Sequence, residues 1–330
     1  MKVAAVIPNW NGAHLLRRLF LTLASQVRPF EVVIVVDNGS SDDSVDVSEQ
    51  FGATVLRFDA NRGFAAAVNA GFAATDAHAV AVLNNDVELS PTWLEVLLAR
   101  LTDDETVAFV SGKTVTTSDP SILDGAFDAI SRGACALRCG SGRADGPYWS
   151  SARRIQFTPL TAVLIRTKCF RSLGGLDELF ESYLEDVDFG LRCASLRYSG
   201  GYEPAATARH VGSATLGSWN ARTVRNIARN QVLLLARHYD AGMLRRFGWS
   251  IAVGQLLWGL VAIRHGATGA WIAGKIEGLL RFRSSRMSGN PQLIPILEQS
   301  EQMIRDVQTE TGEDLYWRLY FALTSRLPRD

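Results

Sequence analysis

The sequence predicts an α/β protein, with a mainly parallel sheet flanked by helices and a helical C-terminal extension. In the first part of the chain, short apolar runs alternate with segments of about ten residues that have helical spacing, which is typical of βαβ units. Beyond residue 217 only helical spacing recurs. We therefore expect a sheet-containing domain over residues 1–215 and a helical extension over residues 216–330.

Each element of the first domain has its own local signal. Apolar, β-branched runs predict the strands, and apolar residues three or four apart predict the helices. Residues 116–156 are rich in Gly, Ser and Arg without a period, so we expect a functional or disordered loop there. The expected strands are 3–7, 31–36, 54–58, 80–83, 107–111 and 160–166, and the expected helices are 14–24, 42–51, 64–74, 91–101, 168–173, 185–198, 219–239, 242–264, 269–283 and 291–310.

Composition limits the function. Of the 330 residues, 47% are hydrophobic, which suffices for a sizeable core, and 34 basic residues balance 34 acidic ones. A nucleic-acid partner is therefore not expected. The balance hides an asymmetry, because residues 216–290 hold 11 Lys or Arg against 2 Asp or Glu. This excess favours an acidic surface or a membrane as a partner of the extension.

The cysteines and the apolar runs indicate the compartment. No pair of the four cysteines has metal-site spacing, and no signal peptide is evident, so reduced thiols in a cytosol are expected. The longest apolar run, about 247–263, is interrupted by polar residues and glycines and is shorter than the roughly 20 residues of a spanning helix. We expect a cytoplasmic protein.

Polar residues follow several of the expected strands. Asn9, Asp37, Asn61 and Asp86 each stand at or just after a strand end, and the carboxyl ends of parallel strands share one edge of a sheet, where such folds bind ligands. The cluster Asn84-Asn85-Asp86 offers the oxygen ligands that a hard divalent cation needs. A helix cap or turn would explain the same residues.

Two further turns open helices. Asp37-Asn38-Gly39-Ser40 places a carboxylate where it can accept from a nucleotide base, although a capped turn accounts for it equally well. Arg62 is a cation at a helix start, which the helix dipole disfavours, so it is better explained by a carboxylate or phosphate partner than by a free surface position. No dinucleotide or P-loop motif is present.

Acidic residues cluster at a third helix start. Glu185-Asp186-Val187-Asp188 can cap the helix, and a carboxylate there can also act as a general base. His210 is one of five histidines. It is either structural or, with Asp86, part of an oxygen-rich metal shell.

Five blocks in this order resemble an inverting GT-A glycosyltransferase of family 2, especially its bacterial rhamnosyltransferase-like branch. The resemblance covers about residues 3–215. The blocks are Ala5-Val6-Ile7-Pro8-Asn9-Trp10-Asn11, Val36-Asp37-Asn38-Gly39-Ser40-Ser41-Asp42, Asn61-Arg62-Gly63-Phe64-Ala65, Leu83-Asn84-Asn85-Asp86-Val87, and Gly174-Gly175-Leu176-Asp177-Glu178 with Glu185-Asp186-Val187-Asp188.

The resemblance implies roles for the matching residues. Pro8, Asn9 and Asp37 would bind the base and ribose of a nucleotide sugar, a dTDP- or UDP-sugar, and Arg62, Asn69 and Asn85 would help to hold this donor. Asp86 would bind Mg2+ or Mn2+, and His210 matches a position that ligates metal in some relatives. Asp186 would be the catalytic base, with Glu185 beside it.

The chain also departs from the family pattern. Asn84 replaces the usual first acid of Asp-x-Asp, so a metal would depend more on Asp86. Pro159-Leu160-Thr161-Ala162 replaces a small Gly-Ala pair, which puts inferences about the acceptor in doubt. No Gln-x-x-Arg-Trp occurs, which argues against a processive synthase.

The expected activity is transfer of one sugar to a bacterial cell-surface glycan or lipid-linked acceptor, with dTDP-rhamnose as the preferred donor. A UDP-hexose or UDP-galactofuranose transferase, or an inactive nucleotide-sugar-binding scaffold, are alternatives. The extension is expected either to lie on the cytoplasmic face of the inner membrane or to pack on the first domain or in a homodimer. The residues expected to face anionic lipid are Arg222, Arg225, Arg229, Arg237, Arg245, Arg246 and Arg264.

Overall fold

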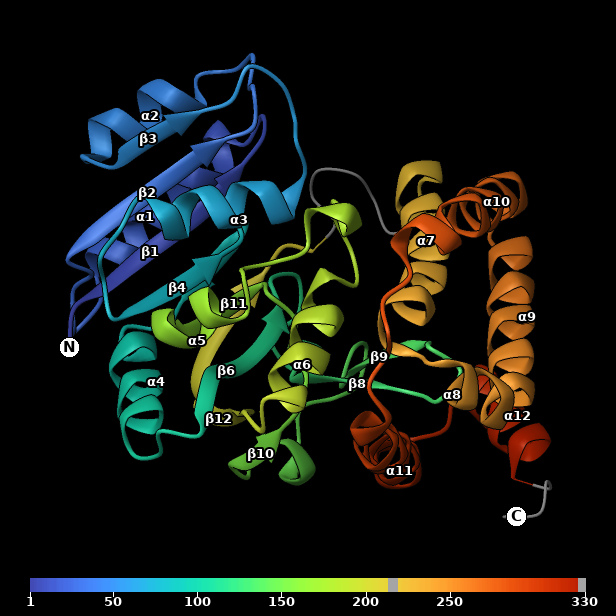
Figure 1. Cartoon of the computed structure of the whole chain (residues 1–330). Helices are drawn as coiled ribbons and strands as arrows, with labels where there is room; N and C mark the ends of the chain where they lie inside the picture. The colour runs from blue at the N-terminus through green and yellow to red at the C-terminus, as the bar shows by residue number, and fades with distance from the viewer. Residues whose placement is uncertain (213–218, 326–330) are drawn as a thin grey trace. The chain divides into compact units, whose positions relative to one another are not determined.

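A mixed sheet organises the N-terminal part of the computed structural model, which describes residues 1–212 and 219–325 (Figure 1). Its strand order is β10-β12-β6-β11-β4-β1-β2-β3, with β5 added to β12 and β7 to β6. The strands are β1 Val3–Asn9, β2 Val32–Asp37, β3 Thr54–Arg57, β4 Ala79–Leu83, β5 Val87–Leu89, β6 Val107–Thr116, β7 Leu123–Gly125, β10 Arg153–Ile155, β11 Ala162–Arg166 and β12 Ser199–His210.

The first four strands are parallel, because helical crossovers connect them. Strand β11 is antiparallel to both β4 and β6. Strand β1 pairs with β2 so that Asn9 stands opposite Asp37. The predicted polar ends of β1 and β2, Asn9 and Asp37, are therefore neighbours at one edge of the sheet.

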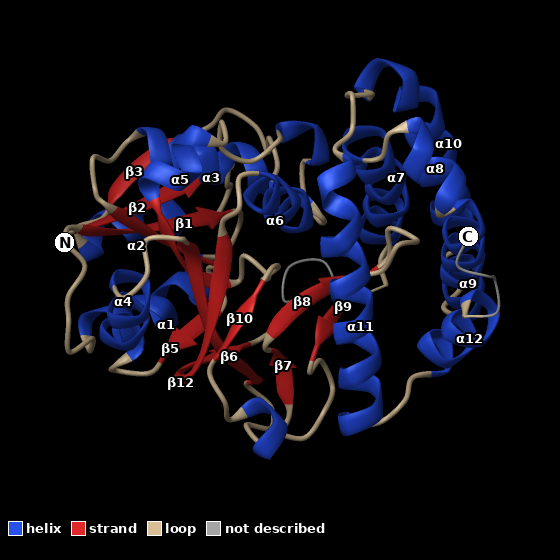
Figure 2. Ribbon diagram, turned by 60° about the horizontal axis from the view of Figure 1, so that its bottom comes forward, coloured by secondary structure: helices blue, strands red, loops and turns tan. Residues whose placement is uncertain are grey.

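Helices cover both faces of this sheet. Figure 2 shows α1 and α4 on one side, where their leucines and Trp93 enter the main apolar core. On the other side, stacking of Phe72 on Phe170 joins α3 to α5, and the Phe170 ring also contacts Phe189 of α6. These helices are α1 Ala13–Ala24, α2 Ser44–Phe51, α3 Phe64–Ala73, α4 Trp93–Thr102, α5 Thr167–Ser172 and α6 Glu185–Ser195.

The chain divides into two compact units. One unit comprises residues 1–128 and 140–215, and the other comprises residues 129–139 and 216–330, within the described limits. The boundary predicted between residues 215 and 216 lies outside the described residues. The fold class expected from the sequence, a mainly parallel mixed sheet with flanking helices and a helical C-terminal region, is confirmed.

The expectation of a loop over residues 116–156 was wrong. This segment continues β6 and forms β7, β8 Phe127–Ile130, β9 Ala136–Cys139, the 3-10 helix η1 Pro147–Trp149 and β10. Strands β8 and β9 pair in a small separate sheet. Strands of three or four residues are too short to show a period. Strands β7, β8 and β9 pair with nearby segments, whereas β10 pairs with the distant β12.

The second unit is built from helices. The predicted helix 242–264 is divided at Phe247, and α12 was not predicted. The helices are α7 Ala221–His238, α8 Ala241–Arg246, α9 Gly248–Arg264, α10 Thr268–Ser285, α11 Ile294–Thr311 and α12 Leu315–Thr324. None of the described helices is long and apolar enough to cross a membrane.

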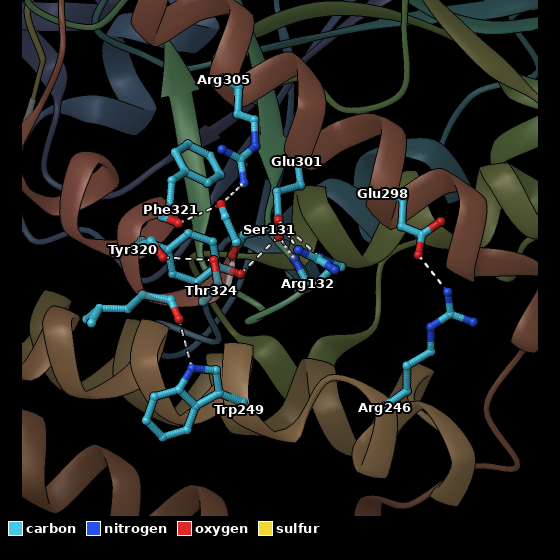
Figure 3. Close-up of polar contacts among 12 residues, drawn as sticks. Ser131, Arg132, Arg246, Trp249, Glu298, Glu301, Arg305, Tyr320, Phe321 and Thr324 are labelled. Carbon is cyan, nitrogen blue, oxygen red and sulfur yellow. Dashed lines mark hydrogen bonds and ion pairs between the residues drawn. The ribbon is translucent and has the colours of Figure 1, made fainter. Parts of the chain in front are cut away.

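A buried ion pair fixes α11 within this unit (Figure 3). Glu301 of α11 is 3% exposed and accepts hydrogen bonds from the Arg132 guanidinium and backbone N–H and from the Tyr320 hydroxyl. These bonds satisfy the carboxylate in the interior, which makes its burial tolerable. The segment around Arg132 thus belongs to the helical unit, although it lies far from it in sequence.

Candidate active site

A line of hydrogen-bonded side chains runs along the carboxyl edge of β4, β1 and β2. The Asn85 amide donates to Asn9 Oδ1 at 2.8 Å, and Asn9 Nδ2 donates to Asp37 Oδ1 at 3.2 Å. Asp37 also accepts from the Ser40 N–H at 2.9 Å. Asn9, Asp37 and Asn85 are all buried, so each amide and carboxylate is oriented by its neighbour. The structure thus brings together three of the predicted donor-binding residues.

Gly12 makes room for this line. A Cβ atom at Gly12 would lie 2.2 Å from Asn85 Nδ2 and 2.6 Å from Asn9 Oδ1, so only glycine permits the two side chains to meet there. Pro8, the residue before Asn9, is buried in β1 opposite Val36. The strand end that carries Asn9 is therefore rigid.

Asp86 faces His210 beside this line. Asp86 Oδ1 lies 3.1 Å from His210 Nε2, and Asp124 Oδ2 lies 2.9 Å from His210 Nδ1. The three residues come from the β4–β5 turn, the end of β12 and β7. Pairing of β5 and β6 with β12 places them together. The predicted pair of Asp86 and His210 is thus close in space.

The surroundings of His210 favour its charged form. Burial opposes the charge, but the hydrogen bonds to Asp124 and Asp86 outweigh it and raise the pKa of His210 to about 9. In the free protein at neutral pH, both ring N–H groups therefore donate, one to each carboxylate. A cation that binds His210 must replace the proton on the nitrogen that it binds.

The chemistry of these groups fits a divalent cation. Carboxylate and imidazole are both ligands of Mn2+, and a carboxylate on the second ring nitrogen is the usual support of a metal-binding histidine. Among residues 1–212 and 219–325, no group of three or more His, Cys, Asp or Glu side chains is arranged to hold a metal by itself. Asp86 and His210 would supply two ligands, and further ligands would have to come from a bound substrate or water.

Arg62 and Asn69 belong to a neighbouring group around Glu178. Arg62 lies 3.7 Å from Glu178 and stacks over the Phe58 ring, and its backbone N–H donates to Asn38 Oδ1 at 3.3 Å. Asn69 donates to the Leu176 carbonyl at 2.9 Å and to Glu178 Oε1 at 3.2 Å. Both predicted donor-binding residues therefore contact the Gly-Gly-Leu-Asp-Glu block.

The start of α6 is tied to the same region. Phe64 and Ala65, at the start of α3, donate backbone N–H bonds to Ser182 Oγ and to the Glu181 carbonyl. Glu181, Tyr183 and Leu184 all have positive φ values, 58°, 73° and 65°. Three strained residues directly before the acidic cluster are characteristic of a functional turn.

The three acids of α6 have different surroundings. Asp188 is buried and accepts a hydrogen bond from Arg192 at 2.8 Å. Its role is therefore to stabilise the structure. Glu185 is also buried, whereas Asp186 is partly exposed and accepts from the Val187 N–H at 2.8 Å. Asp186 is therefore the most accessible carboxylate of the cluster.

Asp124 was missed by the sequence reasoning. It lies in the segment that lacked a period, and its partner His210 is 86 residues further along the chain. No local signal links them, because β6 and β12 must first pair. Gly12, whose size the Asn85 contact requires, was also missed as part of the site.

A comparison of the sequence with known protein families matches the segment that carries most of these site residues. Residues 4–123 match the family model for glycosyl transferase family 2. That segment contains β1 to β6 and every residue of the hydrogen-bonded line, together with Arg62, Asn69 and Asp86. His210 and α6 lie outside the matched segment.

Curated relatives of this chain carry glycosyltransferase names. A pre-mycofactocin glycosyltransferase of Mycobacterium tuberculosis is 34% identical over 225 residues, covering 67% of this chain and 45% of that protein. An N-acetylglucosaminyl-diphospho-decaprenol L-rhamnosyltransferase of the same organism is 27% identical over 269 residues, covering 73% of this chain and 85% of that protein. The chain thus spans about half the length of the first relative.

Solved structures share the fold. A GalNAc-T7 structure with UDP, GalNAc and Mn2+ superimposes with a TM-score of 0.64 at 14% identity, over 94% of this chain and 58% of that one. A mannosyltransferase from Pyrobaculum calidifontis with GDP-Man and Mn2+ gives 0.54 at 15% identity, over 99% and 88%. These likenesses confirm the GT-A fold that the sequence blocks led us to expect.

Proposed function

We propose that this chain is an inverting, metal-dependent glycosyltransferase. It moves one sugar from a nucleoside diphosphate donor to a bacterial cell-surface glycan or a lipid-linked acceptor. The observation that carries the proposal is the buried line from Asn85 through Asn9 to Asp37, beside Asp86 at the carboxyl edge of three parallel strands. A sheet edge of this kind is where α/β folds bind nucleotides.

In this proposal Pro8, Asn9 and Asp37 bind the base and ribose, and Asn85 and Arg62 contact the rest of the donor. Asn69 supports them by holding Glu178, the partner of Arg62. Asp86 and His210 hold Mg2+ or Mn2+. When bound, such a cation offsets the charge that develops on a leaving diphosphate.

The chemical step is a single displacement. Asp186, with Glu185 beside it, accepts the proton of the acceptor hydroxyl as that oxygen attacks the anomeric carbon. The bond from this carbon to the diphosphate oxygen breaks on the opposite face, and the nucleoside diphosphate leaves with the electron pair. One attack from the opposite face inverts the anomeric configuration.

We propose dTDP-rhamnose as the donor and a lipid-linked glycan as the acceptor. The support is the likeness to the mycobacterial L-rhamnosyltransferase, 85% of which this chain covers. A lipid-linked acceptor requires the enzyme to work at a membrane, so we also propose that it lies peripherally on the cytoplasmic face of the inner membrane.

A thermal-shift panel of nucleotide sugars, each with and without Mn2+, tests the proposal. A ligand at 100 times its Kd that binds only the folded state adds about 2.7 kcal/mol to the free energy of unfolding. We expect dTDP-rhamnose with Mn2+ to raise the Tm most. A larger rise in Tm with UDP-hexose or UDP-galactofuranose would identify that sugar nucleotide as the donor instead. No rise in Tm with any nucleotide sugar would refute the proposal.

A transfer assay completes the test. Donor binding without hydrolysis or transfer, in the presence of Mn2+ and lipid-linked acceptors, would identify an inactive scaffold instead. A processive product would contradict the single transfer that we propose.

A further inference from the structure

The helical unit exposes an unusual amount of apolar surface on three helices. Among the described residues, eleven of the eighteen exposed large hydrophobic side chains lie on α9, α10 and α12. Monomeric soluble proteins rarely expose apolar side chains in such a cluster. Those of α9 and α10 are 45–79% exposed, and they are Trp249, Leu256, Leu260, Ile263, Ile272, Ile276, Leu279 and Leu280.

The apolar face of α9 is continuous. Every exposed position of α9 from Trp249 to Ile263 carries an apolar residue, and these positions recur three, four or seven residues apart, as one face of a helix requires. Ala252 is the smallest of them. On α10, the exposed Ile272, Ile276 and Leu280 lie four residues apart and form a second such stripe.

Helix α9 is the neighbour of both other helices. In Figures 1 and 2 it lies next to α10 at one end and to α12 at the other, and Trp271 of α10 packs against Gly259 of α9. The Trp249 indole N–H donates to the Leu323 carbonyl at 3.0 Å, which links α9 to the end of α12 (Figure 3). Trp249 and Leu323 are each about half exposed, so the apolar stripe of α12, with Leu315 and Leu319, continues that of α9.

Cations border the stripes of α9 and α10, whereas the α12 stripe begins beside the exposed Glu313 and Asp314. No acidic residue occurs from residue 241 to residue 276, whereas Arg264 at the end of α9 and Arg283 on α10 are exposed. Glu277 is the sole acid of α9 and α10, and Arg225, Arg229 and Arg281 neutralise it. The exposed margin of the α9 and α10 stripes is therefore positive.

We propose that this α9–α10–α12 face inserts into the headgroup region of an anionic lipid bilayer. The inference deepens the peripheral membrane location proposed above and rests on it. Apolar side chains would enter the acyl boundary, the Trp249 ring would lie at the interface, and the bordering arginines would contact lipid phosphates.

A second copy of the chain fits this face less well. In a symmetric dimer the same patch meets itself, so the arginines at its margin would lie near their own counterparts. Along α9 and α10 the one acid, Glu277, is already surrounded by three arginines, and the exposed Glu313 and Asp314 lie at the start of α12. A lipid surface supplies the missing negative charge.

Flotation of the purified full chain with vesicles tests the inference. The vesicles contain phosphatidylcholine alone or phosphatidylcholine mixed with phosphatidylglycerol. The variant Leu256→Gln/Leu260→Gln removes two exposed leucines from α9, and Leu21→Gln, which changes a 73% exposed leucine of α1, is the matched control. We expect the wild type and the control to float with the anionic vesicles, and the double variant to bind about tenfold or more weakly.

A second variant, on α10, shows whether weaker binding of the first variant reflects loss of the apolar face rather than misfolding. Ile276→Gln/Leu280→Gln should weaken flotation similarly, and Arg264→Gln/Arg283→Gln should weaken binding to anionic vesicles by about fivefold per arginine. Equal flotation of the α9 variant, the α10 variant and the control would overturn the inference. So would a wild-type dimer that the α9 variant dissociates, if neither protein floats.

Donor binding separates this inference from the proposed function. The flotation variants should retain the Tm rise caused by the nucleotide sugar, because they change no residue of the sheet edge. Loss of flotation with unchanged donor binding is the expected result. Flotation of the wild type without donor binding would refute the glycosyltransferase proposal, whereas the inference that this face binds lipid would still be supported.

Discussion

Gly12→Ala should weaken donor binding although it replaces no donor-binding residue. The added methyl carbon would lie 2.2 Å from Asn85 Nδ2, whereas contact at rest needs about 3.5 Å, so the amide must move by roughly 1 Å or more. Such a shift breaks the 2.8 Å bond from Asn85 to Asn9. Loss of one buried hydrogen bond costs about 1–3 kcal/mol, which corresponds to about a fivefold to 150-fold rise in Kd for the nucleotide if the bond orients the binding groups.

Isothermal titration of the nucleoside diphosphate with Mn2+ measures this change. Gly146→Ala is the matched control, because a Cβ atom at Gly146 meets nothing within 4 Å. Denaturant unfolding of both variants shows that the comparison is made on folded protein. Equal affinity of wild type, Gly12→Ala and Gly146→Ala would show that the Asn85–Asn9 contact plays no part in donor binding.

Three further predictions concern the base, the histidine and a half-buried lysine. Asp186→Asn should abolish transfer while the titrated donor affinity is kept, and near-normal turnover would exclude Asp186 as the base. Asp124→Asn should weaken Mn2+ binding about 10–100-fold, as seen in the spin-resonance signal of free Mn2+, whereas Asp119→Asn, an exposed control in the same segment, should not. Burial lowers the pKa of Lys275 to about 8 from 10.5, so the unfolded chain binds the extra proton between these values. The free energy of unfolding of the wild type relative to Lys275→Met should therefore rise by about 1.4 kcal/mol per pH unit from pH 8 to 10.5, and a flat difference in denaturant titrations would contradict this.

The parts of the fold that the sequence predicted are those with local signals. Strands β1 to β4 are buried, apolar and β-branched, and their polar ends locate the sheet edge without further information. Asn9, Asp37 and Asp86 were therefore expected at one edge of the sheet before their contacts were known. Short right-handed crossovers are consistent with the adjacent positions of β1, β2 and β3, but they do not give the order of the remaining strands.

Strand β12 shows why the rest could not be predicted. It begins Ser199-Gly200-Gly201 and contains Pro204, which are all poor strand residues, yet it is the longest strand of the sheet. Gly200 allows the Phe109 ring to pack directly on the β12 backbone, because a Cβ atom at this position would lie 2.0 Å from the ring. Pairing with β6, about 90 residues earlier, brings His210 to Asp124, and no local pattern encodes that distance.

The arginines of the helical unit fall into two groups that composition cannot distinguish, those paired within the fold and those exposed on its surface. Arg229 is buried and bonded to Asn230 and Glu277, so the prediction that it faces lipid was wrong. Arg225 shares Glu277 with it, and Arg246 pairs with Glu298. These cations stabilise the fold, which leaves the exposed Arg222, Arg245, Arg264, Arg283 and Arg286 to act on a partner. Fewer charges are therefore available to an anionic surface than the sequence count implies, and the continuous apolar stripes of α9 and α10 must supply most of the binding free energy.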